Sequence, residues 1–262
     1  RSSGTAVASG HDSRCLTSRS DAWLARTTAA LCAHQSVRGH ACTAIVAQAA
    51  SGWIPPDPVL AVGPKYVLEV VNSGFTVYSK DGGLERSYTN LQTFFDPILD
   101  VIPCAPADCF VFDPRVLYTH WHNKFILAAL VRDDTNQRSY IVFAISQTDS
   151  PLGGWWQYYT YDTSSAADAW TDYSGLSADG QGVYFTGNNF FWAGGFKYAI
   201  EISIRPDVFS GTWNGGWIFW DIRWNEAGNP QAFDIQPAVP THGFPGDDAT
   251  FFVNTFNSSG SK

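Results

Sequence analysis

Apolar and polar positions alternate in short runs along most of the chain, and these runs recur in groups. In the clearest group, turns rich in Asp, Asn, Pro and Gly separate apolar or aromatic runs at 113–120, 124–131, 139–146 and 155–162. Such runs, bounded by such turns, predict strands that pair as an antiparallel meander. A second group with the same order covers 172–224.

Each group opens with one signature: an Asp, a short apolar run, a turn containing Gly, Pro, His or Asp, and a second apolar run. The opening residues are Asp57, Asp113, Asp172 and Asp234, a period of roughly sixty residues. Four-strand meanders at such a period predict a β-propeller, with a β-sandwich as the alternative. Pro follows the first two Asp residues. Because Pro has no N–H for a central ladder, we expect each Asp-Pro pair to precede the first paired residue of its strand.

The predicted fold class is therefore all-β: a β-propeller or partial propeller of four-stranded antiparallel blades at 53–262, preceded by an N-terminal segment at 1–52. Three complete blades and half of a fourth are expected. In the N-terminal segment, the Ala-rich stretch 21–35 favours a partly helical structure, with Asp21 as a candidate N-cap. A strand is expected within 41–48.

The last apolar run, at 249–256, would leave an aromatic edge if nothing paired with it. Open edges of this kind template association. The strand within 41–48 is the candidate partner. Otherwise a second chain or a missing region must cover the edge, and self-association through it is expected.

In a propeller, the first strand of each blade lines the central channel, so the four repeated Asp residues are expected at the mouth of that channel. One interpretation is that each Asp caps a turn at the start of its strand. The other is that the carboxylates converge to perform chemistry or to hold a cation. Two carboxyl groups, one protonated and one ionised, suffice to cleave a glycosidic bond.

Composition narrows the function classes. Aromatic residues make up 15% of the chain and charged residues 15%, a balance that disfavours disorder and favours sheet. The net charge is −8 and the Lys and Arg residues are scattered, so no basic stripe for nucleic acid is present. No apolar run approaches the length of a membrane span.

Cysteine usage and the absence of Met indicate a processed chain in an extracellular or periplasmic compartment. Cys104 and Cys109 bracket a short loop that a disulfide can close. The N-terminal segment holds Cys15, Cys32 and Cys42. If Cys104 pairs with Cys109, three cysteines remain, so one of them has no partner and the pairing among them stays open.

Tryptophans gather in two stretches, 155–156 and 213–224, in greater number than one small blade can bury. Exposed indoles bind the faces of sugars, whereas buried ones pack between blades. We expect most to be packing residues and one or two to contact a ligand. The candidates are Trp155, Trp156, Trp213 and Trp217, with Trp220 and Trp224 beside them.

Metal and cofactor signals are weak, and no cofactor is expected. His120 and His122 are two residues apart, as in a metal pair, and His242 occupies the equivalent turn of the last unit. The favoured interpretation is a turn that faces water. Calcium is the other candidate, through oxygen ligands in two turns, where Asp and Asn are also common for turn geometry alone. Those residues are Asp133, Asp134, Asn136, Asp247 and Asp248.

The stretches "PPDPVLAVGPKYVLEVVNSGFTVYSKDGG", "FDPRVLY", "AISQTDSPLGGWWQY" and "DYSGLSADGQGVYF" resemble a group of secreted bacterial β-propeller proteins of mostly unassigned function, over roughly residues 53–255. The Asp at the start of each blade is also similar to the plan of five-bladed arabinanase-like glycosidases. Those enzymes carry an Asp base, a second Asp that tunes pKa and orients, and a Glu acid on successive blades. The resemblance implies the first two roles for Asp57 and Asp113, whereas Asp172 stands where the Glu is expected.

This departure favours an extracellular binding or adhesion module for a carbohydrate or surface polymer. The four repeated Asp residues and the exposed Trp residues would form its site. The alternatives are a glycoside hydrolase that uses Asp57, Asp113 and Asp172, and a structural subunit of an extracellular assembly.

Overall fold

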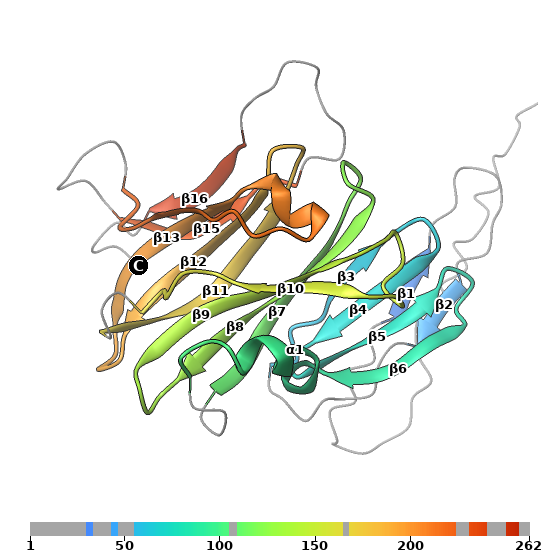
Figure 1. Cartoon of the computed structure of the whole chain (residues 1–262), viewed down its shortest axis with the longest axis horizontal. Helices are drawn as coiled ribbons and strands as arrows, with labels where there is room; N and C mark the ends of the chain where they lie inside the picture. The colour runs from blue at the N-terminus through green and yellow to red at the C-terminus, as the bar shows by residue number, and fades with distance from the viewer. Residues whose placement is uncertain are drawn as a thin grey trace, which may run out of the picture.

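The computed structural model describes residues 30–33, 43–46, 55–104, 109–164, 168–223, 231–239 and 250–256. Within these residues the protein is built mainly from antiparallel sheets, three with four strands and two with two (Figure 1). The prediction of an all-β protein with four-stranded antiparallel units is confirmed.

Each four-stranded sheet is one blade, and its strands pair in chain order. The first blade consists of β3 (Val59–Val62), β4 (Tyr66–Val71), β5 (Gly74–Ser79) and β6 (Leu84–Asn90). The second consists of β7 (Cys109–Thr119), β8 (Lys124–Asp133), β9 (Arg138–Ser146) and β10 (Trp155–Tyr159). The third consists of β11 (Ala169–Ala178), β12 (Val183–Phe191), β13 (Phe196–Ile204) and β14 (Gly216–Phe219). β15 (Ala232–Pro237) and β16 (Phe252–Phe256) form the two-stranded fourth unit.

The first strands of successive blades contact one another in the order β3, β7, β11, β15. In Figure 1 the second blade, green to yellow, lies between the cyan first blade and the gold-to-orange third. Consecutive meanders joined through their first strands form the arrangement of a propeller. The first strands are therefore the structural elements that bring residues of different blades together.

The core lies between the blades, and β8 shows how the sequence builds it. Phe125, Leu127 and their alternate neighbours on β8 pack toward the first blade. Ile126, Ala128 and Leu130 pack toward the third. A strand buried on both faces requires an uninterrupted apolar run, which explains why 125–131 contains no polar residue.

The N-terminal segment differs from the expectation. Ala30–Ala33 forms strand β1, which pairs with β2 (Thr43–Val46), so the helix predicted over 21–35 is wrong for these four residues. The strand expected within 41–48 is confirmed, but its partner is β1 and not β16. Pairing with a strand close in sequence closes a shorter loop than pairing across the whole chain. Within the described residues, β16 pairs with β15 alone, and self-association through β16 remains a prediction.

One α-helix, α1 (Leu91–Leu99), lies between the first and second blades and was not predicted. Its N-cap Asn90 accepts a hydrogen bond from the backbone N–H of Thr93 at 3.2 Å. Leu91, Phe95 and Leu99 are buried at helical spacing. A 3₁₀-helix, η1 (Pro206–Ser210), follows β13. Among the described residues, no helix is long and apolar enough to cross a membrane.

Cys104 and Cys109 form a disulfide at the start of β7, and both side chains are buried. Replacing both cysteines by Ala is expected to lower the free energy of unfolding by about 2 kcal/mol, because the bridge restricts a short loop of the unfolded chain. Urea unfolding of the variant and the wild type under non-reducing conditions measures the difference. Equal midpoints, or free thiols at both positions in the native protein, would refute the pairing.

Candidate functional site

A residue with a positive φ angle recurs at the first strand of every blade: Asp57 at 43°, Asp113 at 46°, Tyr173 at 51° and Asp234 at 53°. Asp and Asn tolerate this left-handed conformation better than most other residues. At the last three positions the ladder to the neighbouring strand skips two residues, which is a β-bulge. The repeated signature therefore marks a residue at positive φ in every unit, which lies in a β-bulge in the last three units and just before β3 in the first.

The Asp-Pro pair of the second blade occupies this bulge. β7 begins at Cys109, and its pairing with β8 jumps from Phe112 to Arg115. The expectation that the pair precedes the ladder is therefore wrong for Asp113 and Pro114. Pro is tolerated within the strand because a bulged residue has no ladder partner, so its missing N–H leaves no hydrogen bond unmade.

The third blade is offset by one residue from its predicted alignment. Asp172 is the last paired residue before the bulge of β11, and Tyr173 holds the left-handed position that Asp113 and Asp234 hold in their blades. The side chain of Asp172 accepts a hydrogen bond from the backbone N–H of Tyr173 at 2.9 Å. Asp172 therefore reaches the site from a different backbone position than Asp113.

Two buried asparagines hold Asp57, Asp113 and Asp234, the three Asp residues of the signature that have a positive φ angle. Asn72 donates from Nδ2 to Oδ2 of Asp57 at 2.9 Å and accepts at Oδ1 from the backbone N–H of Asp113 at 2.8 Å. Asn188 makes the matching pair of bonds to the side chain and backbone N–H of Asp234, at 2.5 and 3.1 Å. Asn72 thereby fixes the first and second blades to each other at the level of their carboxylates.

Three of the four predicted carboxylates meet in one pocket of about 690 Å³. Its lining residues are Pro55, Asp57, Pro58, Val59, Asn72, Phe112, Asp113, Arg115, Asp172 and Tyr173. Asp234 does not line it. Asn72, Arg115 and Tyr173 were missed from the sequence, although Asn72 and Asn188 each follow an apolar run in their blades, which is the signal that could have found them.

The carboxyl groups of Asp113 and Asp172 line the same pocket and interact with each other. Burial raises the pKa of Asp113, and the neighbouring Asp172 raises it further through the hydrogen bond and charge repulsion. The charge of Arg115 and a hydrogen bond with Asn72 act in the opposite direction. Because a neighbouring carboxyl group disfavours the charged form, Asp113 keeps its proton to a higher pH than an isolated Asp.

Arg115 and Tyr173 complete the wall of the pocket. Nε of Arg115 donates to the backbone oxygen of Ser174 at 2.7 Å, and its guanidinium lies 5.6 Å from the centre of the Tyr173 ring. The Tyr173 side chain is exposed. A cation, an open aromatic ring and a carboxyl pair therefore surround the same space.

The raised pKa of Asp113 predicts a pH-dependent stability effect. Because the folded-state pKa lies above the ordinary value of 3.8, the native state binds more protons in this window, and stability falls as the pH rises through it. Asp113→Asn cannot ionise, so it is expected to raise the melting temperature at pH 7 and to leave it unchanged below pH 3.8. Calorimetry of the variant and wild type at both pH values measures this. A stability loss at pH 7, or an equal gain at both values, would exclude the buried-carboxyl account.

The four candidate tryptophans lie away from the pocket lining. Trp155 packs edge-on against Phe94 at 5.6 Å, and Trp156 lies under the ammonium group of Lys124 at 4.9 Å. Trp213 and Trp217 are exposed. Trp220 is exposed as well, and Trp224 lies outside the described residues.

The candidate metal ligands do not converge. Among the described residues, no group of three or more His, Cys, Asp or Glu side chains could hold a metal ion. His120 and His122 lie in the turn between β7 and β8. The expectation that this turn faces water is wrong for His122, whose ring stacks on Phe209 at 3.6 Å and contacts the backbone oxygen of Asp179 at 3.0 Å. Burial lowers the pKa of His122. His242 lies outside the described residues.

The calcium candidates at 133–136 form a turn. Oδ1 of Asp133 accepts from the backbone N–H of Asn136 at 2.9 Å, and Oδ2 accepts from the Asn136 side chain at 2.7 Å. Asp134 contacts Arg132. Asp247 and Asp248 lie outside the described residues.

The sequence matches no protein family and no curated protein. Among solved structures, it is similar to an endo-arabinanase of glycoside hydrolase family 43 from Bacillus licheniformis, at 13% identity and a TM-score of 0.41. The match covers 69% of this chain and 60% of that enzyme, so the chain spans less than two thirds of the enzyme's length. A likeness this distant assigns no activity.

Proposed function

We propose that the pocket at the first strands of the three blades hydrolyses glycosidic bonds. The observation that carries the proposal is that Asp113 and Asp172 line one pocket, where their interaction raises the pKa of Asp113. Hydrolysis requires one carboxyl group that is still protonated, to protonate the leaving oxygen. The paired carboxyl groups supply this acid without a Glu at the third blade.

Asp57 is the second functional carboxylate in this proposal. It lines the same pocket and accepts a hydrogen bond from Asn72, whose other amide atom holds the backbone of Asp113. In this arrangement Asp57 activates a water molecule or attacks the sugar carbon, while the Asp113–Asp172 pair donates the proton. Tyr173 offers an exposed ring face for a sugar, and Arg115 offers a donor for its hydroxyl groups.

Binding without hydrolysis is the competing function, and one observation favours it: no Glu is among the described residues that line the pocket. An adhesion module would use the same carboxylates as hydrogen-bond acceptors for sugar hydroxyls. The two functions differ in whether product forms.

The test is release of reducing ends from a panel of plant and bacterial polysaccharides and of aryl glycosides, over pH 4 to 8. We expect release from at least one substrate, and its loss in Asp57→Asn with binding of that substrate retained. Asp234→Asn is the matched control, because Asp234 holds the equivalent bulge outside the pocket. Binding of a polysaccharide with no release from any substrate would establish the binding module instead.

An extracellular or periplasmic location is part of the proposal. The disulfide between Cys104 and Cys109 supports it, because disulfides persist in oxidising compartments. A carbohydrate polymer outside the cell is then the partner that the site would meet.

A further inference from the structure

The indole of Trp213 is a fixed and partly open platform. Its ring stacks on that of Tyr158, with centroids 6.0 Å apart and planes at 29°, and lies 6.2 Å from the ring of Phe143. The hydroxyl of Tyr158 donates to the backbone oxygen of Val208 at 3.0 Å, so the supporting ring cannot turn freely. Trp213 nevertheless remains 39% exposed. An indole supported from within and open to solvent is the group that binds the apolar face of a flat ligand.

Backbone hydrogen bonds tie the loop that carries Trp213 to the residues before it: the N–H of Gly211 donates to the backbone oxygen of Val208 and the N–H of Thr212 to that of Asp207. The loop follows η1 (Pro206–Ser210), whose Val208 and Phe209 are buried. Gly211 and Gly215 flank the indole at φ angles of 83° and 80°, which glycine adopts without strain. A Cβ atom at Gly211 would lie 2.8 Å from the ring of Trp156. The platform is therefore preorganised, which lowers the entropy lost on binding.

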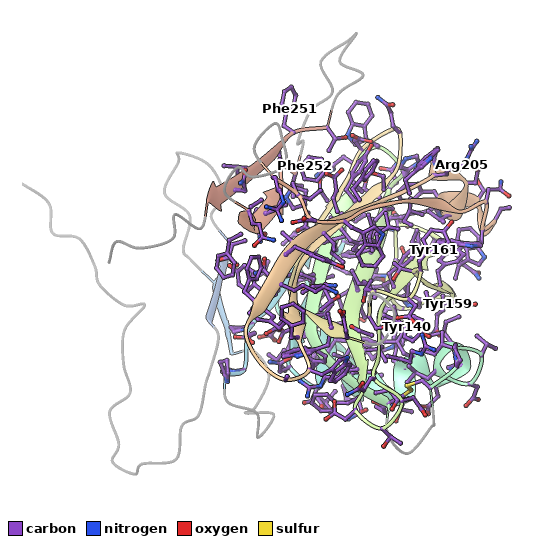
Figure 2. The ribbon with its side chains drawn as sticks, turned by 90° about the vertical axis from the view of Figure 1, so that its left-hand side faces the viewer. Tyr140, Tyr159, Tyr161, Arg205, Phe251 and Phe252 are labelled. Atoms are coloured by element: carbon purple, nitrogen blue, oxygen red, sulfur yellow. A yellow bond between two sulfur atoms is a disulfide. The ribbon has the colours of Figure 1, made fainter. Side chains whose placement is uncertain are left out.

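Hydrogen-bonding groups surround the platform. The ring of Tyr161 lies 6.5 Å from that of Trp213, and its hydroxyl donates to the backbone oxygen of Gly216 at 3.3 Å. Nε of Arg205 pairs with Asp207 at 3.3 Å. The cation and the carboxylate offset each other, so a neutral ligand fits better than an ionic one. Figure 2 shows Arg205, Tyr161 and Tyr159 along one side of the molecule.

We propose that Trp213 and Tyr161 form a second carbohydrate-binding site, which holds a neutral polysaccharide chain on the outer strands of the second and third blades. The pocket sits at the first strands of the blades, whereas Trp213 precedes β14 and Tyr161 follows β10, the fourth strands. A neutral sugar offers an apolar ring face and several hydroxyls, matching an indole beside a phenol and a neutralised ion pair.

A protein partner is the competing occupant of this surface. A stable protein interface needs about 800 Å² of contact on each side, built around a continuous apolar centre. The ring of Trp213 sits in the sequence Gly-Thr-Trp-Asn-Gly-Gly, at 211–216, whose other members are small or polar, and the exposed Trp217 and Phe219 follow on β14. The polar groups that flank the indole favour the polysaccharide, and the test below separates it from a protein partner. The site depends on its own residues and would bind a polysaccharide whether or not the pocket hydrolyses it.

The test is affinity electrophoresis and pull-down with neutral polysaccharides of several backbone types, in an Asp57→Asn background so that no ligand is consumed. Trp213→Ala is expected to weaken binding at least tenfold, and Trp213→Phe to retain most of it. Trp121→Ala is the matched control, because Trp121 is 44% exposed and lies in a different loop, the turn after β7. In the background with Asp57 intact, Trp213→Ala should leave hydrolysis of a short aryl glycoside unchanged.

Three results would overturn the proposal. The first is that no neutral polysaccharide is retained by the starting protein. The second is that Trp213→Ala, with a native melting profile, binds as tightly as Trp121→Ala. The third is that light scattering finds a dimer that Trp213→Ala dissociates, which would make a second copy of the chain the partner. Loss of hydrolysis alone would count against the pocket and not against this site.

Discussion

Asp113→Asn and Asp172→Asn are each expected to lower kcat by about 10²- to 10⁴-fold, the range that a positioned general acid contributes. In the proposed mechanism the neighbouring Asp172 keeps Asp113 protonated, so each carboxyl group is needed for the pair to act as the acid. The double variant is therefore expected to lose little more than the worse single variant, since residues that act as a unit are not additive. Steady-state kinetics on the best substrate of the panel gives both numbers.

The pH profile of kcat distinguishes loss of the general acid from a loss of correctly folded protein. Removal of the Asp172 charge lowers the pKa of Asp113, so the alkaline limb of kcat in Asp172→Asn should move to lower pH. Asp234→Asn should keep the wild-type rate and profile. If that control variant loses as much activity as Asp113→Asn, the pocket is not the reactive centre. Fully additive losses in the double variant would contradict the joint action of the pair.

Phe143→Ala is expected to lower the free energy of unfolding by about 3–5 kcal/mol, as for other fully buried aromatic residues. Phe143 lies on β9 with no exposed surface, in the core between the second and third blades. Its ring contacts those of Tyr158 and Phe185, each at 5.1 Å. The buried residues around Phe143 come from strands of both blades, so they can fill only part of the cavity that its removal leaves.

Phe251→Ala provides the matched control for this loss. Phe251 is 65% exposed beside β16, and its removal is expected to change stability by no more than about 0.5 kcal/mol. Urea unfolding of both variants, with the slope compared to that of the wild type, measures the difference. A change below about 1 kcal/mol for Phe143→Ala would mean that the two blades do not share this core.

The strands and their grouping were predictable from the sequence because each blade has its own alternation and its own turns. The run at 124–131 and the turn at 133–136 specify a hairpin by local chemistry alone. The helix at 91–99 was missed because its Pro97 argues against a helix, although its three buried residues have helical spacing. Their packing against neighbouring blades outweighs that local signal.

The site was predictable in its residues but not in its geometry. The repeated Asp marked three pocket residues, yet Asp-Pro is typical both of a strand start and of a bulge, and only pairing with β8 distinguishes the two. The one-residue offset that brings Asp172 to Asp113 depends on the register of β11 with β12. Such contacts arise from strands of different blades, so no local pattern records them.

The most direct test of the carboxyl pair is a ¹³C NMR titration of the aspartate side-chain carboxyl carbons in the wild type, Asp113→Asn and Asp172→Asn. We predict one signal in the wild type with a midpoint above the ordinary 3.8. It should vanish in Asp113→Asn and move to lower pH in Asp172→Asn. If no aspartate titrates above its ordinary range, or if the highest midpoint survives in Asp113→Asn, Asp113 does not retain its proton and the proposed acid does not exist.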